Sequence, residues 1–288
     1  MKRLGGFALT MAAAMAGFRC LPGLAAAWQR TFALPLLQAL HRVSAAIPFP
    51  VLEPLALLLG AFCLNRRLRA AALAFVVGMY ALAWYPGYFA APVAPYEAPG
   101  DLEGLCDDLT DALNASALAF DSPCESAGAV AGMPWARAKP ARYPEWMRGL
   151  GIGGLFAPWT GEALVDADAP PGYLPFTCVH ELIHLQGVAD EGAANIEAWR
   201  ACMHRGGMYA DSARLWALRY ALARLDAPAR GRALERMSDD LRSVMTFGAP
   251  DRPSLCARLL GIAEPTRDYD ALLGYIAAQN EPERGGSP

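Results

Sequence analysis

The stretch "HELIHLQGVADEGAANIEAW", residues 180–199, decides how the rest of this chain is interpreted. It holds two of the four histidines in the chain, His180 and His184. On a helix, residues four apart lie on one face, so these two imidazoles are stacked one turn apart. Both rings can then reach one tetrahedral zinc ion at about 2.0–2.1 Å. The spacing therefore predicts a helix that binds Zn²⁺.

The acid after the first histidine gives this site a catalytic interpretation. Glu181 cannot bind the same ion from its position on the helix, but its carboxylate lies beside the ion. A carboxylate placed there can take a proton from zinc-bound water, which is the physical meaning of an HExxH motif. The sequence therefore predicts a zinc-dependent hydrolase with Glu181 as general base.

Three acids downstream are candidates for the third metal ligand. Gly187 stands where the first helix should end, and a second helix is predicted from about residue 190. Asp190 completes the longer HExxHxxGxxD spacing, whereas Glu191 has Asn195 one turn later on the same helical face, and Glu197 follows further along. A polar side chain such as Asn195 steadies a ligating histidine from behind. We favour Glu191 as the ligand, with Asp190 as the alternative.

The bulk composition indicates a membrane protein. The chain has 288 residues, of which 55% are hydrophobic and only 18% charged, with a formal net charge of −3. Mean hydropathy is +0.20, and the apolar excess lies in the first third of the chain. No basic stripe appears, which argues against nucleic acid as a partner.

Three apolar runs precede residue 95, at residues 4–18, 43–64 and 70–94. A helix of about 20 apolar residues crosses a bilayer. The third run meets this length without any charge, and the second meets it with one acid, Glu53. The first is short, and "GLAAAW" at 23–28 resembles a signal-peptide cleavage site. Two or three transmembrane helices are therefore predicted, with the lipid bilayer as a partner.

Basic residues predict the orientation. Lys2 and Arg3 precede the first run, and "NRRLR" at 65–69 separates the second from the third. Basic clusters stay in the cytoplasm. Residues 1–94 are thus predicted to form the transmembrane region in the cytoplasmic membrane. Residues 95–100 follow as a linker, and 101–288 as an extracytoplasmic domain.

This domain is predicted to be mainly α, with a small β-hairpin just before the histidine helix. Asp101 is a good N-cap for a first helix, and the hairpin falls within 151–170. Helices are expected near 176–186, 191–205, 208–225, 229–246 and 268–279. Cys106 and Cys124 could form a disulfide if the compartment is oxidising.

Several further residues are candidates for contact with a substrate. The segment "APWTGEALV" at 157–165 is either an edge strand that pairs with a peptide or a structural strand. Glu162 within it is either a substrate contact or a solvated side chain. A hydrolase also needs a donor for the developing oxyanion. His204, Tyr209 and Tyr173 are available, and the sequence does not select among them.

Residues 151–195 resemble a bacterial family of membrane-anchored, zinc-peptidase-like proteins with a gluzincin-type HExxH motif and no settled function. The resemblance rests on "TGEA", "PFT", the motif itself, Gly187 and "AN" at 194–195, and more weakly on "DYDALLGYI" at 268–276. It implies N-terminal transmembrane helices and an α-rich zincin-like domain. The chain departs from the family at Ala193, where a second acid is usual, and at Ile196, where an aromatic residue is usual.

Two functions follow from these observations. The first is a membrane-anchored zinc metallopeptidase that hydrolyses a peptide or protein substrate. The alternative is a membrane protein without catalysis that keeps zinc for structure or for sensing. A site closed by four protein ligands would favour the alternative, because catalytic zinc keeps one position open.

Overall fold

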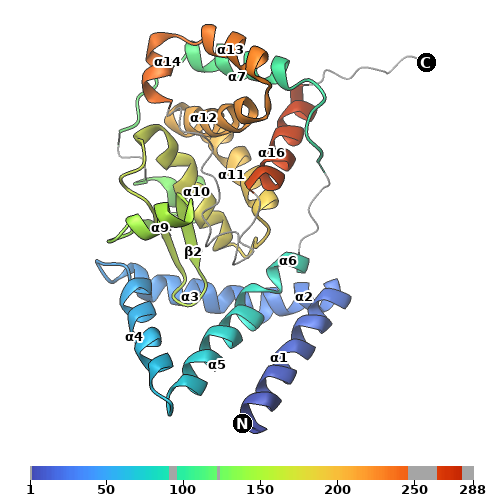
Figure 1. Ribbon diagram of the computed structural model, residues 1–288, viewed down its shortest axis with the longest axis vertical. Coiled ribbons are helices and arrows are strands. Elements are labelled where there is room, and N and C mark those ends of the chain that lie inside the picture. The colour runs from blue at the N-terminus through green and yellow to red at the C-terminus, as the bar shows by residue number, and fades with distance from the viewer. Residues whose placement is uncertain (1, 91–95, 122–123, 246–264, 281–288) are drawn as a thin grey trace, which may run out of the picture.

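The computed structural model describes residues 2–90, 96–121, 124–245 and 265–280, and it has two parts (Figure 1). The first 90 residues form a lower layer of helices. The remaining described residues form a mainly α domain with a small sheet, which lies on top of that layer. The fold class is thus mainly α, as the sequence predicts.

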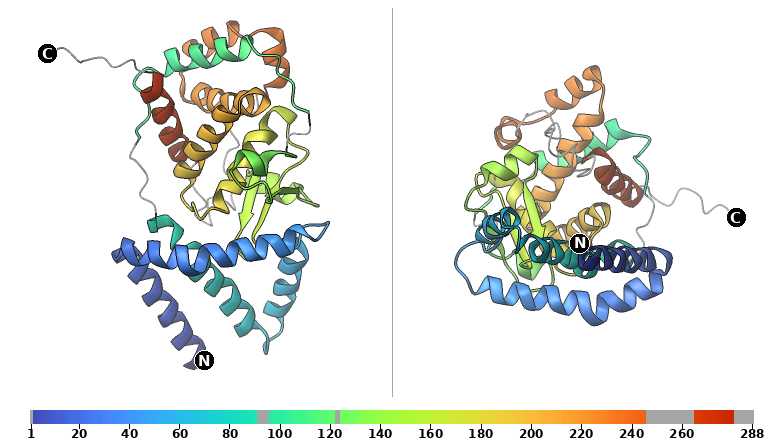
Figure 2. Two further views of the ribbon diagram at one scale, coloured as in Figure 1. Left: turned by 180° about the vertical axis from the view of Figure 1, so that it is seen from behind. Right: turned by 60° about the horizontal axis from the view of Figure 1, so that its bottom comes forward.

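The lower layer contains one long helix that lies crosswise beneath the domain. It runs through α2, the π-helical turn η1 and α3, and α1 leaves its first end at an angle of 113° (Figure 2). A helical hairpin made of α4 and α5 leaves the other end and returns to the domain through η2 and α6. The bounds are α1 Lys2–Cys20, α2 Pro22–Trp28, η1 Gln29–Ala33, α3 Leu34–Ala45, α4 Leu52–Leu64, α5 Arg69–Met79, η2 Tyr80–Trp84 and α6 Gly87–Ala90.

One helix in this layer, Arg69–Ala90, is long and apolar enough to cross a membrane. Its 22 residues span about 33 Å at 1.5 Å per residue. The pair Gly5–Cys20 and Pro22–Ala45 would add a second span only if the bent pair counts as one. The predicted second span at 43–64 is wrong, since residues 46–51 leave the helix and α4 has only 13 residues. By length and composition these candidates are weak evidence for a membrane.

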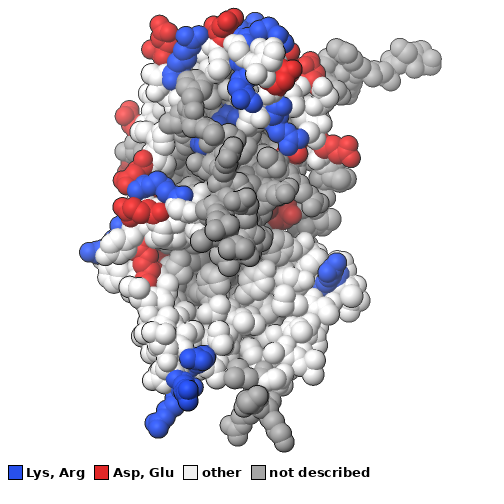
Figure 3. Space-filling view, viewed as in Figure 1, with Lys and Arg blue, Asp and Glu red and all other residues white. Residues whose placement is uncertain are grey.

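The surfaces of the two parts differ in polarity. Within the described residues, all exposed large apolar side chains except Trp135 and Tyr143 lie between Leu9 and Tyr88. Figure 3 shows most of the charged side chains on the upper domain, with further basic groups at the tip of the lower layer between α4 and α5 and at the side of that layer near α2. The lower layer therefore presents the apolar surface of the molecule.

Helix α10 forms the centre of the upper domain and packs against α11, α12 and the sheet. Asp101 caps α7 by accepting from the Gly104 amide, as predicted. The predicted helix at 229–246 is two helices, because Ser238 caps a new one. The bounds are α7 Leu102–Asn114, α8 Ala127–Val130, α9 Glu145–Leu150, η3 Pro171–Tyr173, α10 Leu174–His184, α11 Glu191–Arg205, α12 Gly207–Arg224, α13 Ala227–Glu235, α14 Asp239–Val244 and α16 Pro265–Asn280.

The sheet has three strands, one more than the predicted hairpin. Its order is β1 (Ala138–Pro140), β3 (Glu162–Val165), β2 (Gly154–Ala157), with β1 parallel and β2 antiparallel to β3. Because β3 has a neighbour on each side, the segment 157–165 is not the edge strand that could pair with a peptide. That position belongs to β2.

A disulfide joins Cys124 to Cys178, with their Cα atoms 5.7 Å apart. The predicted pair Cys106–Cys124 is wrong, since Cys106 is a free, buried thiol in α7. Cys178 lies in α10 two residues before the first histidine. The bridge therefore attaches the histidine helix to the segment at 124, and it fits an oxidising compartment.

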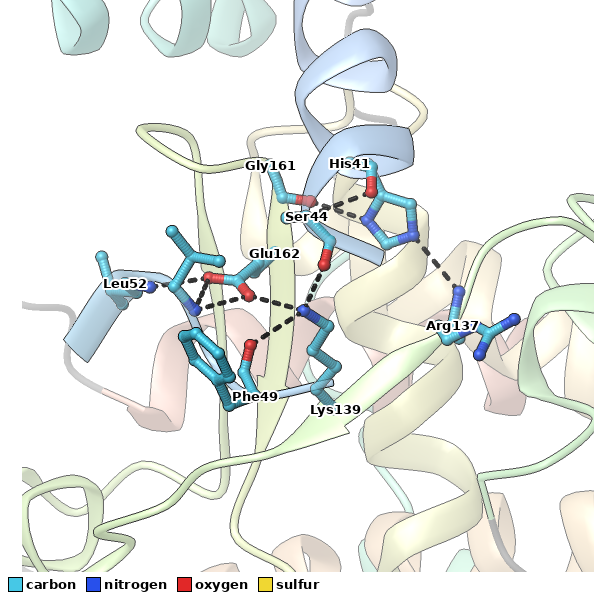
Figure 4. Close-up of polar contacts among 9 residues, drawn as sticks. His41, Ser44, Phe49, Leu52, Arg137, Lys139, Gly161 and Glu162 are labelled. Atoms are coloured by element: carbon cyan, nitrogen blue, oxygen red, sulfur yellow. Dashed lines mark hydrogen bonds and ion pairs between the residues drawn. The ribbon is translucent and has the colours of Figure 1, made fainter. Parts of the chain in front are cut away.

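A buried ion pair links the sheet to the lower layer (Figure 4). Lys139 Nζ lies 2.9 Å from Glu162 Oε1 and also donates to the carbonyl groups of Ser44 and Phe49. The Glu162 carboxylate accepts from the amides at positions 51 and 52, which begin α4. Glu162 is 1% exposed, so both readings of it as a substrate contact and as a solvated side chain are wrong. We call this group the Lys139 cluster.

A second contact beside the Lys139 cluster holds α3 to the same sheet. His41 Nδ1 donates to the Gly161 carbonyl at 2.7 Å, and His41 Nε2 accepts from the Arg137 amide at 3.2 Å. Gly161 has φ +67°, and an added Cβ would lie 2.6 Å from the His41 amide. The lower layer and the domain are thus joined by specific polar contacts as well as by apolar packing.

Candidate metal centre

Helix α10 carries the histidines and is buried along its whole length. Its apolar residues pack on every side, and Pro175 stands in its first turn, where a missing amide costs nothing. The chain turns back at Gly187, whose φ of +88° suits glycine. Helix α11 then begins, with Asp190 as its N-cap. This short turn brings the start of α11 back to the end of α10.

The turn places three possible ligand atoms at the corners of a small triangle. His180 Nε2 lies 3.1 Å from Glu191 Oε2 and 3.2 Å from His184 Nε2, and His184 Nε2 lies 3.5 Å from the same carboxylate oxygen. Ligands at about 2.05 Å from a tetrahedral ion are about 3.3 Å apart. Within the described residues, these three side chains form the group that could hold a metal ion.

The outer nitrogen of His184 is fixed by a hydrogen bond. His184 Nδ1 lies 2.6 Å from the Val188 carbonyl, so Nδ1 carries the proton and Nε2 presents its lone pair. His180 Nδ1 and Asn195 Oδ1 are both buried without a hydrogen-bond partner in the described part of the chain. Asn195 lies one turn after Glu191 on α11 and is 1% exposed, and its supporting role stays a prediction.

The other two acids in the stretch have different roles. Asp190 Oδ1 accepts from the Ala193 amide at 2.9 Å, so this carboxylate is engaged in capping α11. Glu197 pairs with Arg200 at 3.1 Å near the surface. Neither belongs to the triangle, which leaves Glu191 as the acid that the turn brings to the histidines.

Glu181 lies beneath the edge strand β2. Burial raises the pKa of Glu181 to about 7, partly offset by the two imidazoles, while the charge of Glu191 raises it further. Its carboxylate accepts a hydrogen bond from the Phe156 amide. At Gly154 an added Cβ would lie 2.3 Å from Glu181 Oε1. The strand thus binds the carboxylate through the Phe156 amide, and the glycine at position 154 leaves the space that the carboxylate occupies.

Without a metal ion, the triangle pairs a protonated imidazole with an ionised carboxylate. Burial lowers the pKa of His184, but the Glu191 carboxylate outweighs that effect and raises the pKa to about 9. Burial raises the pKa of Glu191, yet His184 and His180 hold it well below its usual range. A divalent cation is the natural replacement for such a proton-bound group.

Aromatic side chains surround the triangle, and two of them were not foreseen from the sequence. Trp84 from η2 meets the His184 ring edge to face with centroids 5.4 Å apart, and it stacks on Phe156 at 5.3 Å. Burial raises the pKa of Tyr269 well above its usual value, and Tyr220, Glu191 and Glu181 raise it further. The weak likeness of 268–276 to the family's closing helix was the one signal for Tyr269.

Of the three candidate oxyanion donors, His204 lies far from the triangle. His204 is exposed in the last turn of α11, about 20 Å along the helix from Glu191. Tyr209 is buried in α12, and the Tyr173 ring packs edge to face on Trp216.

Comparison with known proteins gives one match. A family model described as "Protein of unknown function (DUF3810)" matches residues 124–245. No curated protein and no solved structure matches the chain. The matched range contains the whole sheet, α10 and α11, so the chain carries a DUF3810 domain of unknown function built around a group that could bind a metal.

Proposed function

We propose that this protein is a zinc-dependent metallopeptidase anchored in the cytoplasmic membrane, with residues 101–288 outside the cytoplasm. His180, His184 and Glu191 would hold Zn²⁺, and Glu181 would act as the general base. The triangle of Nε2 and Oε2 atoms with sides of 3.1, 3.2 and 3.5 Å carries this proposal. The hydrogen bond from His184 Nδ1 to the Val188 carbonyl supports it, because histidine ligands are commonly held by a hydrogen bond on their outer nitrogen.

Hydrolysis of a peptide bond consumes one water molecule and needs no further co-reactant. Bound zinc would supply a Lewis acid that polarises the scissile carbonyl and makes water more acidic. Glu181 removes a proton from that water as the oxygen attacks the carbonyl carbon. The same carboxyl then gives the proton to the leaving nitrogen when the C–N bond breaks. A pKa of about 7 suits a group that must take and return a proton near neutral pH.

The edge strand β2 gives this site a way to hold an extended peptide. β2 is paired with β3 on one side, and it lies directly over Glu181. A substrate strand that hydrogen-bonds to the free edge of β2 would pass close to the triangle.

Two observations support a membrane location with the domain outside. Arg66, Arg67 and Arg69 lie at the end of the α4–α5 hairpin away from the domain, and basic residues remain on the cytoplasmic side. The Cys124–Cys178 disulfide belongs to the domain, and disulfides persist outside the cytoplasm.

Metal content and cleavage tested together decide the proposal. The purified full chain in detergent should contain about one zinc per chain, and Glu181→Gln should keep that zinc. The same variant should lose cleavage of an unfolded protein substrate, since its amide cannot accept the proton. Cleavage at the wild-type rate by Glu181→Gln would exclude Glu181 as the base.

The non-catalytic alternative makes the opposite prediction. A structural site closes around the ion with four protein ligands. Within the described residues, three side chains converge and Asp190 is engaged elsewhere, which favours an open position and hence catalysis. Zinc that is bound in wild type without any cleavage, and whose removal unfolds the domain, would favour the alternative.

A further inference from the structure

The loop between the two ligand helices rests directly on the lower layer. Gln29 Nε2 donates to the Gly187 carbonyl at 3.2 Å, although Gln29 comes from the crosswise helix. At Gly87 an added Cβ would lie 2.8 Å from both Ala189 Cβ and the Gly187 carbonyl oxygen. The metal-binding turn, residues 185–190, therefore lies against helices that belong to the first 90 residues.

Besides Gln29 of the crosswise helix, the turn contacts the domain end of the apolar helix Arg69–Ala90. Trp84, which contacts His184, is 15 residues after Arg69, so it lies about 22 Å along the helix from the basic end. Trp and Tyr gather at the surface of a bilayer, where their rings meet the headgroups. The aromatic residues at this end of the layer are Trp28, Phe32, Tyr80, Trp84, Tyr85, Tyr88 and Phe89.

The crosswise helix also indicates that the membrane surface lies at the height of these aromatic residues. It exposes Leu24, Phe32 and Val43, while Leu37 and His41 on other faces are buried against the domain. An amphipathic helix of this kind lies in the plane of the interface with its apolar side toward the acyl chains. Trp28 Nε1 also donates to the Leu82 carbonyl at 2.7 Å, which ties this helix to the apolar helix Arg69–Ala90.

From these contacts we infer that the metal centre works at the membrane surface, on extended juxtamembrane segments of other membrane-anchored proteins. The inference rests on the proposed peptidase function and adds its substrate class. Trp84, one of these aromatic residues, packs edge to face against the His184 ring, so the triangle lies at the same height as the aromatic residues. Segments that leave a bilayer are held there by their own anchors, which raises their local concentration.

The first test measures depth and needs no substrate. The full chain is placed in vesicles with lipids that carry a fluorescence quencher on the upper acyl chain. The contribution of Trp84 is obtained from the difference between wild type and Trp84→Phe, and Trp199→Phe serves as the control because Trp199 is similarly buried but lies in α11. Loss of most of the Trp84 emission, with the Trp199 emission retained, is expected. If the quencher left the emission of Trp84 as unchanged as that of Trp199, the inference would be overturned.

The second test identifies the products. New protein N-termini are compared between membranes that contain wild type and membranes that contain Glu181→Gln. We expect them within about ten residues of a transmembrane segment, a stretch that an extended chain covers in roughly 35 Å. New N-termini spread through secreted, unanchored proteins would overturn the inference and leave the peptidase proposal intact. No difference between the two membranes would overturn both.

Discussion

Two buried polar clusters lie near the same sheet, and the comparison of their side chains is informative: the Lys139 cluster lies on β1 and β3, and the metal centre lies on α10 and α11, where Glu181 contacts β2. In the Lys139 cluster, Glu162 has a cation and two backbone amides, and Lys139 has three oxygen partners. In the metal centre, two imidazole nitrogens and a carboxylate oxygen point at one spot, and Glu181 adds a second buried acid. Buried charges whose partners are complete form a structural joint, whereas ligand atoms that converge on one spot could hold a metal ion.

Removal of one ligand should show the largest effect on the metal centre. His184→Ala leaves two ligand atoms, so zinc affinity should fall by at least about 100-fold, more than for the loss of an outer-shell partner. Peptide cleavage should fall below detection. The measurement is metal content after dialysis, together with cleavage rate. His204→Ala is the matched control, because His204 is an exposed histidine of α11, and zinc loss in that variant too would contradict the assignment.

Disruption of the Lys139 cluster should affect stability without a direct effect on metal binding. Lys139→Met leaves the Glu162 carboxylate buried without its cation, which typically costs about 3–5 kcal/mol. The midpoint of thermal unfolding should fall clearly, and Lys139→Met with Glu162→Gln should recover most of it.

The control for this prediction is an exposed ion pair. Arg232 pairs with Glu103 at 2.8 Å on the surface, and surface pairs contribute little. Arg232→Met should leave the unfolding midpoint unchanged. A drop as large as that of Lys139→Met would mean that the Lys139 cluster has no special role in joining the two parts.

A methyl group on the edge strand should disturb catalysis and spare the metal. In Gly154→Ala the new Cβ would meet Glu181 Oε1 at 2.3 Å, so the carboxylate must move. A displacement of about 1 Å can cost 10²-fold in rate, and zinc content should stay the same. Gly153→Ala is the control, since nothing lies within 4 Å of its Cβ. Equal rates for the two variants would show that Gly154 does not position the base.

The smallest expected effect is the stability that the metal-free wild-type chain loses as pH rises, and that Glu181→Gln should keep. The pKa of Glu181 is raised by burial from 4.5 to about 7. Below pH 4.5 both folded and unfolded states are protonated, so the residue has no effect. As pH rises to 7 the unfolded state ionises more easily, and stability is lost.

Glu181→Gln does not titrate, so this variant should exceed wild type by about 1–3 kcal/mol at pH 8 and match it at pH 4. Chemical unfolding in the presence of a chelator measures the difference. If Glu181→Gln were less stable than wild type at pH 8, the ionised Glu181 carboxylate would not destabilise the folded chain, and the prediction would be wrong.

The sequence was informative where chemistry depends on short spacing. His180 and His184 share a helical face by geometry alone, and a tight turn at Gly187 followed by an acid brings that acid back to them. Contacts between distant segments could not be predicted in this way. Nothing local in "TGEA" shows that Glu162 meets Lys139, 23 residues earlier, and the start of α4, about 110 residues earlier.

Apolar runs were the least certain guide. Residues 43–64 read as one span because their hydropathy is continuous, but the chain leaves the helix at 46–51, where two prolines lie close together. Likewise, Cys124 was assigned to the nearer thiol, Cys106. The real partner, Cys178, is 54 residues away, and only the packing of α10 brings it within reach.

By itself, then, the sequence determined the helix that carries both histidines, the acid that follows the turn, the mainly α class and the apolar character of the first 90 residues, because each depends on neighbours that are close in sequence. Tertiary structure decided the rest. It made Glu162 part of a joint, put β2 at the edge of the sheet and brought Trp84 onto His184. These relations join residues tens to more than a hundred positions apart, and only the packed core sets the distance between them.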